Sequence, residues 1–304
     1  MRNYSLLLKT VKSLGCTVLE NEPMKNHTTF EIGGNADLFV FVENKAALKS
    51  ILSVVCKEDI PYFVLGKGSN ILVSDKGIRG VVLYLCGEFS KIELIDERTI
   101  RCGSSVNLAK LCSFAQKNSL SGLEFAWGIP GSAGGAAYMN AGAYSGEMKD
   151  VLLMCEHVTN RGEEGAFKGE NLDLSYRHSV YTDKDFIITA ITIKLKKYDP
   201  SKIKERMDDY ISRRKAKQPL EYPSAGSVFK RPEGHFAGEL IQRCNLRGIN
   251  INDAYVSEKH AGFIINKGNA TCEDVLNLIK LIQSKVKSET GVSLECEVKA
   301  VGEF

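Results

Sequence analysis

The sequence lacks the patterns that usually identify a metalloprotein or a disulfide-rich protein. Its nine cysteines form no CxxC pair, and their odd number and irregular spacing predict free thiols in a reducing compartment. The five histidines form no HExxH or HxH pair, so we expect no protein-bound metal.

Long apolar runs and a large net charge are also missing. No run reaches the ~18 apolar residues of a membrane span, and the short apolar patch near Met1 is interrupted by lysine, unlike a signal peptide. The 40 basic and 37 acidic residues nearly cancel to give +3, which gives no reason to expect nucleic acid or an acidic membrane as partner. We therefore expect a cytoplasmic protein.

The length allows a substantial core. With 304 residues, 43% of them hydrophobic, the chain can form two or three domains. No internal repeat or low-complexity tract is visible.

Small residues dominate one long stretch, from Gly128 to Tyr144. It contains five glycines, five alanines, one proline and one serine, which allow a backbone to approach a ligand closely. Exposed amide groups and a nearby helix start favour a phosphate, so a cofactor pyrophosphate is the predicted ligand. The alternative is a turn that only connects two elements, but the stretch is long for that.

A second glycine turn, Gly66 to Asn70, follows a predicted strand. It is not a dinucleotide fingerprint, because Ile71 occupies the third glycine position and the chain continues as a strand. It is not a P-loop either, because Gly68 follows Lys67 directly. Taken alone, it could be an ordinary tight turn between strands.

Hydrophobic periodicity predicts an α+β protein. Helices are expected over 4–14, 46–57, 106–117, 200–215, 236–244 and 273–285. Strands are expected over 36–42, 62–65, 71–73, 81–85, 92–95, 99–102, 151–159, 186–195, 262–266 and 294–301. The segment 36–65 is predicted to form a β-α-β unit.

Basic residues gather between positions 201 and 232, nine against four acidic residues. For Lys202 and Lys204 a solvated helix face is sufficient explanation. The run from Arg213 to Pro219 is expected to leave the helix and lead into the small-residue turn 224–232, where basic side chains suit a diphosphate.

Seven segments, taken together and in order, resemble the UDP-N-acetylenolpyruvoylglucosamine reductases. They are IGGxA at 32–36, GKGSNIL at 66–72, the stretch 128–146, SYRxS at 175–179, KxP at 217–219, AGSxFKRP at 225–232 and LExEVK at 294–299. One departure is Ser145 before Gly146, where many members have glycine directly after the tyrosine. The chain runs from Pro232 straight into a helix, so it resembles the shorter class, without the tyrosine-bearing insertion.

The resemblance implies an α+β fold with an FAD-binding module of the vanillyl-alcohol-oxidase (PCMH) type and a C-terminal α+β substrate domain. We expect residues 1–74 and 75–216 to form the two parts of the FAD module and 217–304 the substrate domain. The implied reaction uses NADPH to reduce FAD, and then reduces the enolpyruvyl ether of a UDP-sugar to UDP-N-acetylmuramate for peptidoglycan. The UDP-sugar and NADPH are the implied partners.

The resemblance also implies the site residues. Arg177 would stabilise an enolate-like dianion, Ser227 would protonate its α-carbon, and Glu297 would assist if burial raises its pKa. Each has an ordinary alternative: a surface salt bridge for Arg177, a turn-capping hydroxyl for Ser227 and a solvent-facing strand position for Glu297. Substrate binding falls to Tyr176, Arg213, Lys217 and Arg231. The residues expected to bind FAD are Gly66, Gly68, Ser69, Asn70, Gly128, Ile129, Pro130, Gly131, Ser132, Gly134, Gly135, Asn140 and Gly142.

Two other functions fit parts of the sequence. An oxidase of the same fold would use O₂ and predicts a histidine or cysteine tethered to the flavin, but neither glycine segment contains one. A nucleotide-sugar binding protein would give no reason for Arg177, Ser227 and Glu297 to occur together.

Overall fold

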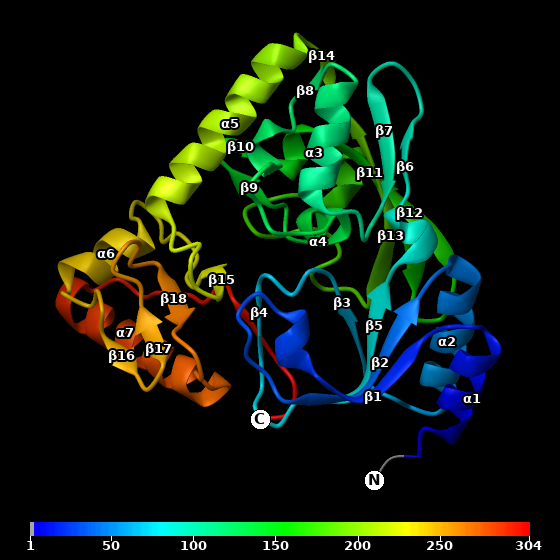
Figure 1. Cartoon of the computed structure of the whole chain (residues 1–304), viewed down its shortest axis with the longest axis horizontal. Coiled ribbons are helices and arrows are strands. Elements are labelled where there is room, and N and C mark those ends of the chain that lie inside the picture. Colours follow the sequence, from blue (N-terminus) through cyan, green and yellow to red (C-terminus); the bar gives the residue numbers. More distant parts are fainter. Residues whose placement is uncertain (1–2) are drawn as a thin grey trace. The chain divides into compact units, whose positions relative to one another are not determined.

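The computed structural model describes residues 3–304 (Figure 1), which form two compact units. Unit 1 contains the chain up to Leu19 together with Leu38–Lys67 and Val81–Arg213. Unit 2 contains Glu20–Asp37, Gly68–Gly80 and Arg214–Phe304. The chain therefore passes between the units several times.

One layer of unit 1 is a four-stranded sheet of order β1-β2-β5-β3, with helices α1 and α2 against it. Leu38, Val40 and Val42 alternate along β2 and face a core formed with both helices, as the period-2 pattern requires. Asn44 caps α2 by accepting a hydrogen bond from the Ala47 amide at 2.9 Å. The bounds are α1 Ser5–Ser13, β1 Val18–Pro23, β2 Asn35–Val42, α2 Lys45–Lys57, β3 Tyr62–Leu65 and β5 Ile78–Leu85. The predicted β-α-β unit is confirmed, with β5 between its two strands.

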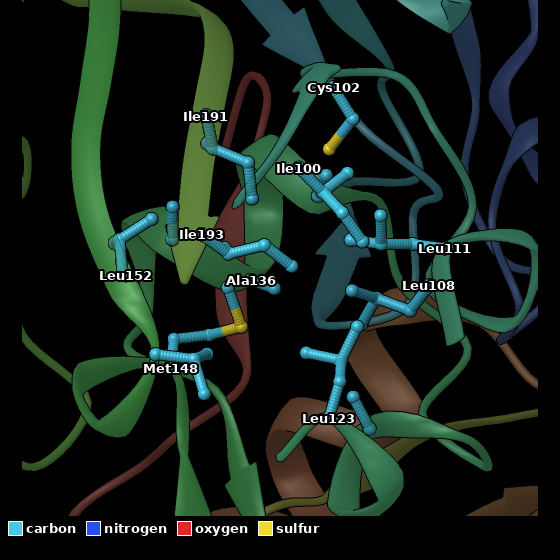
Figure 2. Packing of buried hydrophobic residues seen from close by; sticks show 14 of the residues in the cluster. Ile100, Cys102, Leu108, Leu111, Leu123, Ala136, Met148, Leu152, Ile191 and Ile193 are labelled. Carbon is cyan, nitrogen blue, oxygen red and sulfur yellow. The ribbon is translucent and has the colours of Figure 1, made fainter. Parts of the chain in front are cut away.

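The other layer of unit 1 is an antiparallel sheet of order β12-β11-β13-β7-β6. Ile100 and Cys102 on β7 and Ile191 and Ile193 on β13 point toward Leu108 and Leu111 of α3 (Figure 2). Ala136 of α4 and Met148 belong to the same apolar core. The bounds are β6 Ile92–Leu94, β7 Thr99–Gly103, α3 Leu108–Lys117, α4 Ala133–Tyr138, β11 Leu152–Thr159, β12 Glu164–Lys168 and β13 Phe186–Lys194.

Shorter pieces complete unit 1. Two two-stranded ladders join β8 Leu120–Ser121 to β14 Lys196–Lys197 and β9 Gly142–Ala143 to β10 Gly146–Glu147. Helix α5, Pro200–Lys217, buries Ile203 and Met207 in the core of Figure 2.

Unit 2 is built on an antiparallel sheet of order β15-β18-β17-β16. Phe30, Ile32 and Leu72, from the early segments of the chain, share one core with helices α6 and α7. The last strand, β19, pairs in parallel with β4. The bounds are β4 Ile71–Val73, β15 Ser224–Ser227, α6 Ala237–Arg243, β16 Asn250–Ile251, β17 Ala254–Val256, β18 Phe263–Asn266, α7 Cys272–Thr290 and β19 Lys299–Val301.

The predicted strand 294–301 is wrong for its first half. Residues 295–297 cross the segment 228–230, where the Lys230 amide donates to Glu295 O at 2.9 Å and the Glu297 amide donates to Val228 O at 2.7 Å. Only residues 299–301 then pair with β4. The change of partner interrupts the regular ladder, although Leu294 and Val298 are buried as their alternation predicts.

The predicted end of α5 is also wrong. The first five residues of the predicted run, Arg213–Lys217, form the last turn of the helix, which the Gln218 amide closes by donating to Arg214 O at 2.8 Å. Only Gln218 and Pro219 lie beyond it. Arginine, lysine and alanine are good helix formers, which explains the longer helix.

Two expectations concern cysteines and membranes. All nine cysteines are free thiols, and burial raises the pKa of Cys102 to about 12, so this thiol is unreactive.

Within residues 3–304, none of the helices has the length and apolar character needed to cross a bilayer.

Candidate functional site

The small-residue stretch is partly helical, which corrects the expectation of one long loop. Ser132 caps the six-residue helix α4, accepting a hydrogen bond from the Gly135 amide at 3.3 Å. A Cβ on Gly134 would lie 2.7 Å from Ser104 Cβ, and the Gly134 amide donates to Ser104 O at 2.8 Å. This close packing, together with the cap, outweighs the low helix propensity of glycine.

Many amide groups of the stretch already have protein acceptors. Ile129 donates to Ala126 O, Gly131 to Ile129 O and Gly134 to Ser104 O. Over the described residues 3–304, the amides of Gly128 and Ser132 have no protein acceptor. These two are therefore the backbone donors of the stretch that a ligand could use.

The first glycine turn begins beside this helix cap. A Cβ on Gly66 would lie 2.9 Å from Ser132 Oγ, so glycine allows the two segments to approach within unit 1. In the described part of the chain, the amides of Gly66 and Lys67 have no protein acceptor. The same holds for Gly68, Ser69 and Asn70, which belong to unit 2. A run of unsatisfied amides is typical of anion-binding loops.

Gly68 is required by its surroundings. Its φ is +61°, and a Cβ there would lie 2.2 Å from His27 O. Only glycine fits this combination of left-handed backbone and close approach.

Asn140 and the SYRxS segment lie together in unit 1. The side-chain nitrogen of Asn140 donates to Ser175 O at 3.0 Å and to Glu147 Oε2 at 3.1 Å. Its side-chain oxygen accepts from the backbone amide of Lys149 at 2.9 Å. Ser179 Oγ donates to Tyr138 O at 2.8 Å. Asn140, predicted to bind the cofactor, thus anchors the segment that carries Arg177.

Arg177 lies at the tip of a tight turn. Ser175 and His178 exchange two backbone hydrogen bonds, at 3.2 and 3.1 Å, around Tyr176 and Arg177. Arg177 has a φ of +57°, a strained value for a residue with a side chain. Its half-buried guanidinium lies over the Tyr176 ring, 5.0 Å from the centroid. Strain of this kind persists where the surroundings hold it and is common at functional sites.

Ser227 and Glu297 come from adjacent backbone segments of unit 2. Ser227 ends β15 and donates to Phe229 O at 3.1 Å, and the Glu297 amide donates to Val228 O. Both side chains are half-buried. The structure therefore brings the segments of the predicted serine and glutamate side by side.

Asn70 ties the first glycine turn to the same place. Its side-chain amide donates to Glu297 O at 3.3 Å, and its carbonyl accepts from the Lys299 amide at 3.1 Å. One predicted cofactor residue is thus bound to the segment of one predicted catalytic residue.

The predicted substrate-binding cations are spread over both units. Arg213 belongs to unit 1 and Lys217 and Arg231 to unit 2. Arg213 is exposed and pairs with Asp209 on the same helix at 2.8 Å. The Arg231 guanidinium lies over the exposed Phe236 ring, 4.7 Å from the centroid.

His260 is a residue that the sequence analysis missed. A Cβ on Gly262 would lie 3.0 Å from His260 Cε1 and 3.6 Å from Ser227 Oγ, so the imidazole and the hydroxyl approach the same glycine. Burial lowers the pKa of His260, and the positive charges of Arg247 and Lys217 act in the same direction. Only the fold shows this neighbourhood, because a single histidine far from Ser227 in the sequence forms no motif.

Gln218, directly after Lys217, was also missed. Its side-chain oxygen is buried and, among residues 3–304, has no hydrogen-bond partner. A buried polar atom without a partner is costly, so it marks a place where a ligand or water can bind. No group of three metal-ligating side chains occurs in the described part of the chain.

Comparison with known proteins identifies the family. The chain is 50% identical over 283 residues to UDP-N-acetylenolpyruvoylglucosamine reductase from Syntrophomonas wolfei, covering 93% of this chain and 94% of that protein. The chain belongs to the UDP-N-acetylenolpyruvoylglucosamine reductase family.

Further comparisons agree with this family assignment. The enzyme of the same name from Clostridium tetani is 46% identical over 305 residues, covering 100% of this chain and 99% of the relative. The family models for an FAD binding domain and for the C-terminal domain of the reductase match residues 36–165 and 218–301. The crystal structure of the Thermus caldophilus reductase superposes with a TM-score of 0.80 at 36% identity, covering 94% of this chain and 98% of that one.

Family membership confirms two expectations. The fold class is the predicted α+β arrangement of an FAD-binding module and a C-terminal domain. The protein is an oxidoreductase of the UDP-N-acetylenolpyruvoylglucosamine reductase family, with a role in peptidoglycan synthesis. The division at 74/75 and 216/217 and the individual site residues stay predictions.

Proposed function

We propose that the protein uses NADPH and bound FAD to reduce UDP-N-acetylglucosamine enolpyruvate to UDP-N-acetylmuramate. In this reaction a hydride adds to the terminal vinyl carbon and a proton to the α-carbon. The protein must therefore hold the cofactor, stabilise negative charge beside the substrate carboxylate and deliver one proton.

The backbone fits an FAD diphosphate. In unit 1, the unsatisfied amides of Gly66, Lys67, Gly128 and Ser132 would donate hydrogen bonds to such a group. Gly68, Ser69 and Asn70 are also predicted to bind the cofactor. The other predicted cofactor residues, Ile129, Pro130, Gly131, Gly134, Gly135, Asn140 and Gly142, would shape the surface around these donors. Bound FAD would accept hydride from NADPH and pass it to the substrate.

Ser227 is the proposed proton donor. A serine hydroxyl is a weak acid, so it protonates only a strongly basic carbon such as that of the enolate-like dianion. Glu297, from the neighbouring segment, would return a proton to Ser227 directly or through water. The hydrogen bonds that link Asn70, Glu297 and Val228 support this assignment most strongly, because they bind cofactor turn, carboxylate and serine segments into one unit.

Arg177 would stabilise the dianion. Its planar guanidinium matches a carboxylate. The strained turn already restricts the Arg177 backbone, so less conformational entropy is lost when the substrate binds. The anchoring bonds from Asn140 and Ser179 support a fixed position for this turn.

The diphosphate of the UDP-sugar would bind basic residues. Lys217 and Arg231 would supply charge, and Arg213 and Tyr176 are the other residues predicted to bind the substrate. In unit 2, the unpaired Gln218 oxygen would accept a hydrogen bond from a hydroxyl or N–H group of the substrate, not from its diphosphate, and the neutral His260 adds a second hydrogen-bonding group.

The test separates the two half-reactions. In Ser227→Ala, NADPH should bleach the yellow enzyme at the normal rate, whereas reoxidation by the UDP-sugar under anaerobic conditions should slow by about 10²- to 10⁴-fold. Stopped-flow absorbance of the flavin measures both rates. Glu297→Gln should show the same asymmetry.

Ser224→Ala, on the same strand, is the matched control and should leave both rates unchanged. Equal losses in both half-reactions of Ser227→Ala would remove Ser227 as the acid. A protein that binds no flavin, or that reacts with O₂ but not with the UDP-sugar, would overturn the proposed function.

A further inference from the structure

Lys67 is a half-buried cation without a carboxylate partner. Four lysines of the described chain are half-buried: Lys45, Lys67, Lys230 and Lys299. Lys45 pairs with Glu164 at 3.0 Å, and Lys230 pairs with Glu295. Within residues 3–304, Lys67 forms no salt bridge. Because desolvated charges are normally paired, this ammonium group is suited to an anion that is not part of the chain.

The side chain of Lys67 has a defined position. Its Nζ donates to Tyr84 Oη at 2.9 Å and lies 5.6 Å from the centre of the Tyr84 ring. The Tyr84 ring in turn packs against Phe39 and Phe41, with centroid distances of 5.9 and 5.6 Å. A lysine side chain normally loses substantial conformational entropy when it binds a ligand. The contact with Tyr84 already restricts the Lys67 side chain in the folded protein, so less entropy is lost on binding.

The pair lies where parallel strands end. β3 and β5 are parallel, Leu65 is the register partner of Tyr84, and Lys67 follows β3 by two residues. The region beyond the carboxyl ends of parallel strands is a common ligand site in α/β sheets. The unsatisfied amides of Gly66 and Lys67 lie at this end of β3, and Gly66 lies against Ser132.

We propose that the Lys67 ammonium, held by Tyr84, binds a phosphate group of the cofactor. Two of its three N–H donors remain available after the bond to Tyr84. The charge would act together with the neutral backbone donors of Gly66 and Ser132, so that phosphate is bound by hydrogen bonds and by a fixed positive charge. This inference rests on the proposed use of FAD and adds a residue to its binding site.

The test compares flavins with and without phosphate. Titration of the full-length apoprotein, followed by flavin fluorescence, gives dissociation constants for FAD and for riboflavin. Lys67→Met should weaken FAD binding about tenfold or more and leave riboflavin binding unchanged, and Lys67→Arg should restore most of the FAD affinity. Tyr84→Phe should weaken FAD binding less than Lys67→Met, because the charge remains.

Lys184→Met is the matched control. Lys184 Nζ also lies 5.6 Å from an aromatic centre, that of Phe186, but on a segment without a glycine turn. It should bind both flavins like the wild type. Equal weakening of FAD and riboflavin by Lys67→Met, or unchanged FAD binding, would overturn the proposal. A raised KM for NADPH with unchanged FAD affinity would assign Lys67 to the other phosphate-bearing ligand and overturn it too. If the wild type binds no flavin, the proposed function itself fails.

Discussion

At the scale of single residues, Arg177 combines an unfavourable backbone with a side chain suited to a carboxylate. Its positive φ costs of order 1–3 kcal/mol, which the hydrogen bonds of Asn140 and Ser179 help to offset. A residue placed only for surface charge would gain nothing from this conformation. The strained turn therefore favours a functional role.

Arg177→Lys should test that role. It keeps the charge but loses the planar fork, so flavin reoxidation by the UDP-sugar should slow by about 10²-fold while reduction by NADPH stays normal. Arg177→Gly should lose the same activity. Its free energy of unfolding, measured with urea, should be about 1 kcal/mol higher than that of Arg177→Ala, because glycine tolerates the positive φ.

Arg98→Lys, at an exposed position between β6 and β7, is the control for Arg177→Lys. It should leave reoxidation almost unchanged. If it slows reoxidation as much as Arg177→Lys does, the effect belongs to general electrostatics and not to the turn.

The candidate residues themselves could be predicted only in part. Ser227, Glu297 and Arg177 followed from motifs that resemble a family, but His260 and Gln218 carry no local signal. His260 and Ser227 are far apart in the sequence, and only the fold brings both side chains close to Gly262. The predicted cofactor contact of Asn140 stays a prediction, and its side chain forms three hydrogen bonds to the protein, which the sequence does not indicate.

At the scale of elements, one ion pair joins two strands of the antiparallel sheet. Arg101 on β7 reaches Glu156 on β11 with two bonds of 2.7 and 2.8 Å, and β13 lies between these strands. The hydrogen bonds from Arg101 hold the pKa of Glu156 below its usual value. Bidentate pairs of this kind are stronger than ordinary surface pairs.

Glu156→Gln should lower the free energy of unfolding at pH 7 by about 1 kcal/mol. Because the native pKa of Glu156 is lowered, its stabilisation is present above about pH 4.5 and is lost as the pH falls through the native value. Urea unfolding of both proteins from pH 3 to 7 measures the difference. It should shrink toward zero in acid, and a constant difference would contradict an ionic origin.

Elements with a clear period were predictable, and the exceptions have physical reasons. Strands β2, β3 and β4 and helices α2 and α3 match their sequence patterns closely. Helix α4 was missed because glycine is a poor helix former, and its packing against Ser104 cannot be seen locally. The segment 294–301 bonds to residues 228–230 up to Glu297 and to β4 after it. The alternation of apolar residues in the sequence does not indicate such a change of partner.

At the scale of the whole molecule, unit 2 is assembled from separate parts of the chain. The core takes Phe30, Ile32 and Leu72 from the first quarter of the sequence. Asp75 accepts hydrogen bonds from the amides of Cys272 and Glu273, at 2.8 and 3.0 Å, and so adds to the Thr271 cap of α7. The family model for the C-terminal domain, residues 218–301, therefore covers only part of this unit.

A fragment of residues 214–304 should not fold cooperatively. It lacks three core side chains, the partner of β19 and the Asp75 carboxylate at the start of α7. Together these losses exceed the usual stability of a small domain. Circular dichroism during heating should show no sharp transition. The full-length chain with Asp75→Ala is the control and should stay folded, about 1 kcal/mol less stable. A sharp transition in the fragment would contradict the shared core.

The parallel pairing of β4 with β19 has a consequence for how the protein is made. Leu72 is synthesised 228 residues before its strand partner, Ala300. Pairings between such distant positions form slowly, because a long loop must close first. Unit 2 therefore completes its folding only after β19 has been synthesised, and until then the edge of β4 is exposed to chaperones or to other chains. A stop codon before Lys299 would remove the closing strand and leave that edge open.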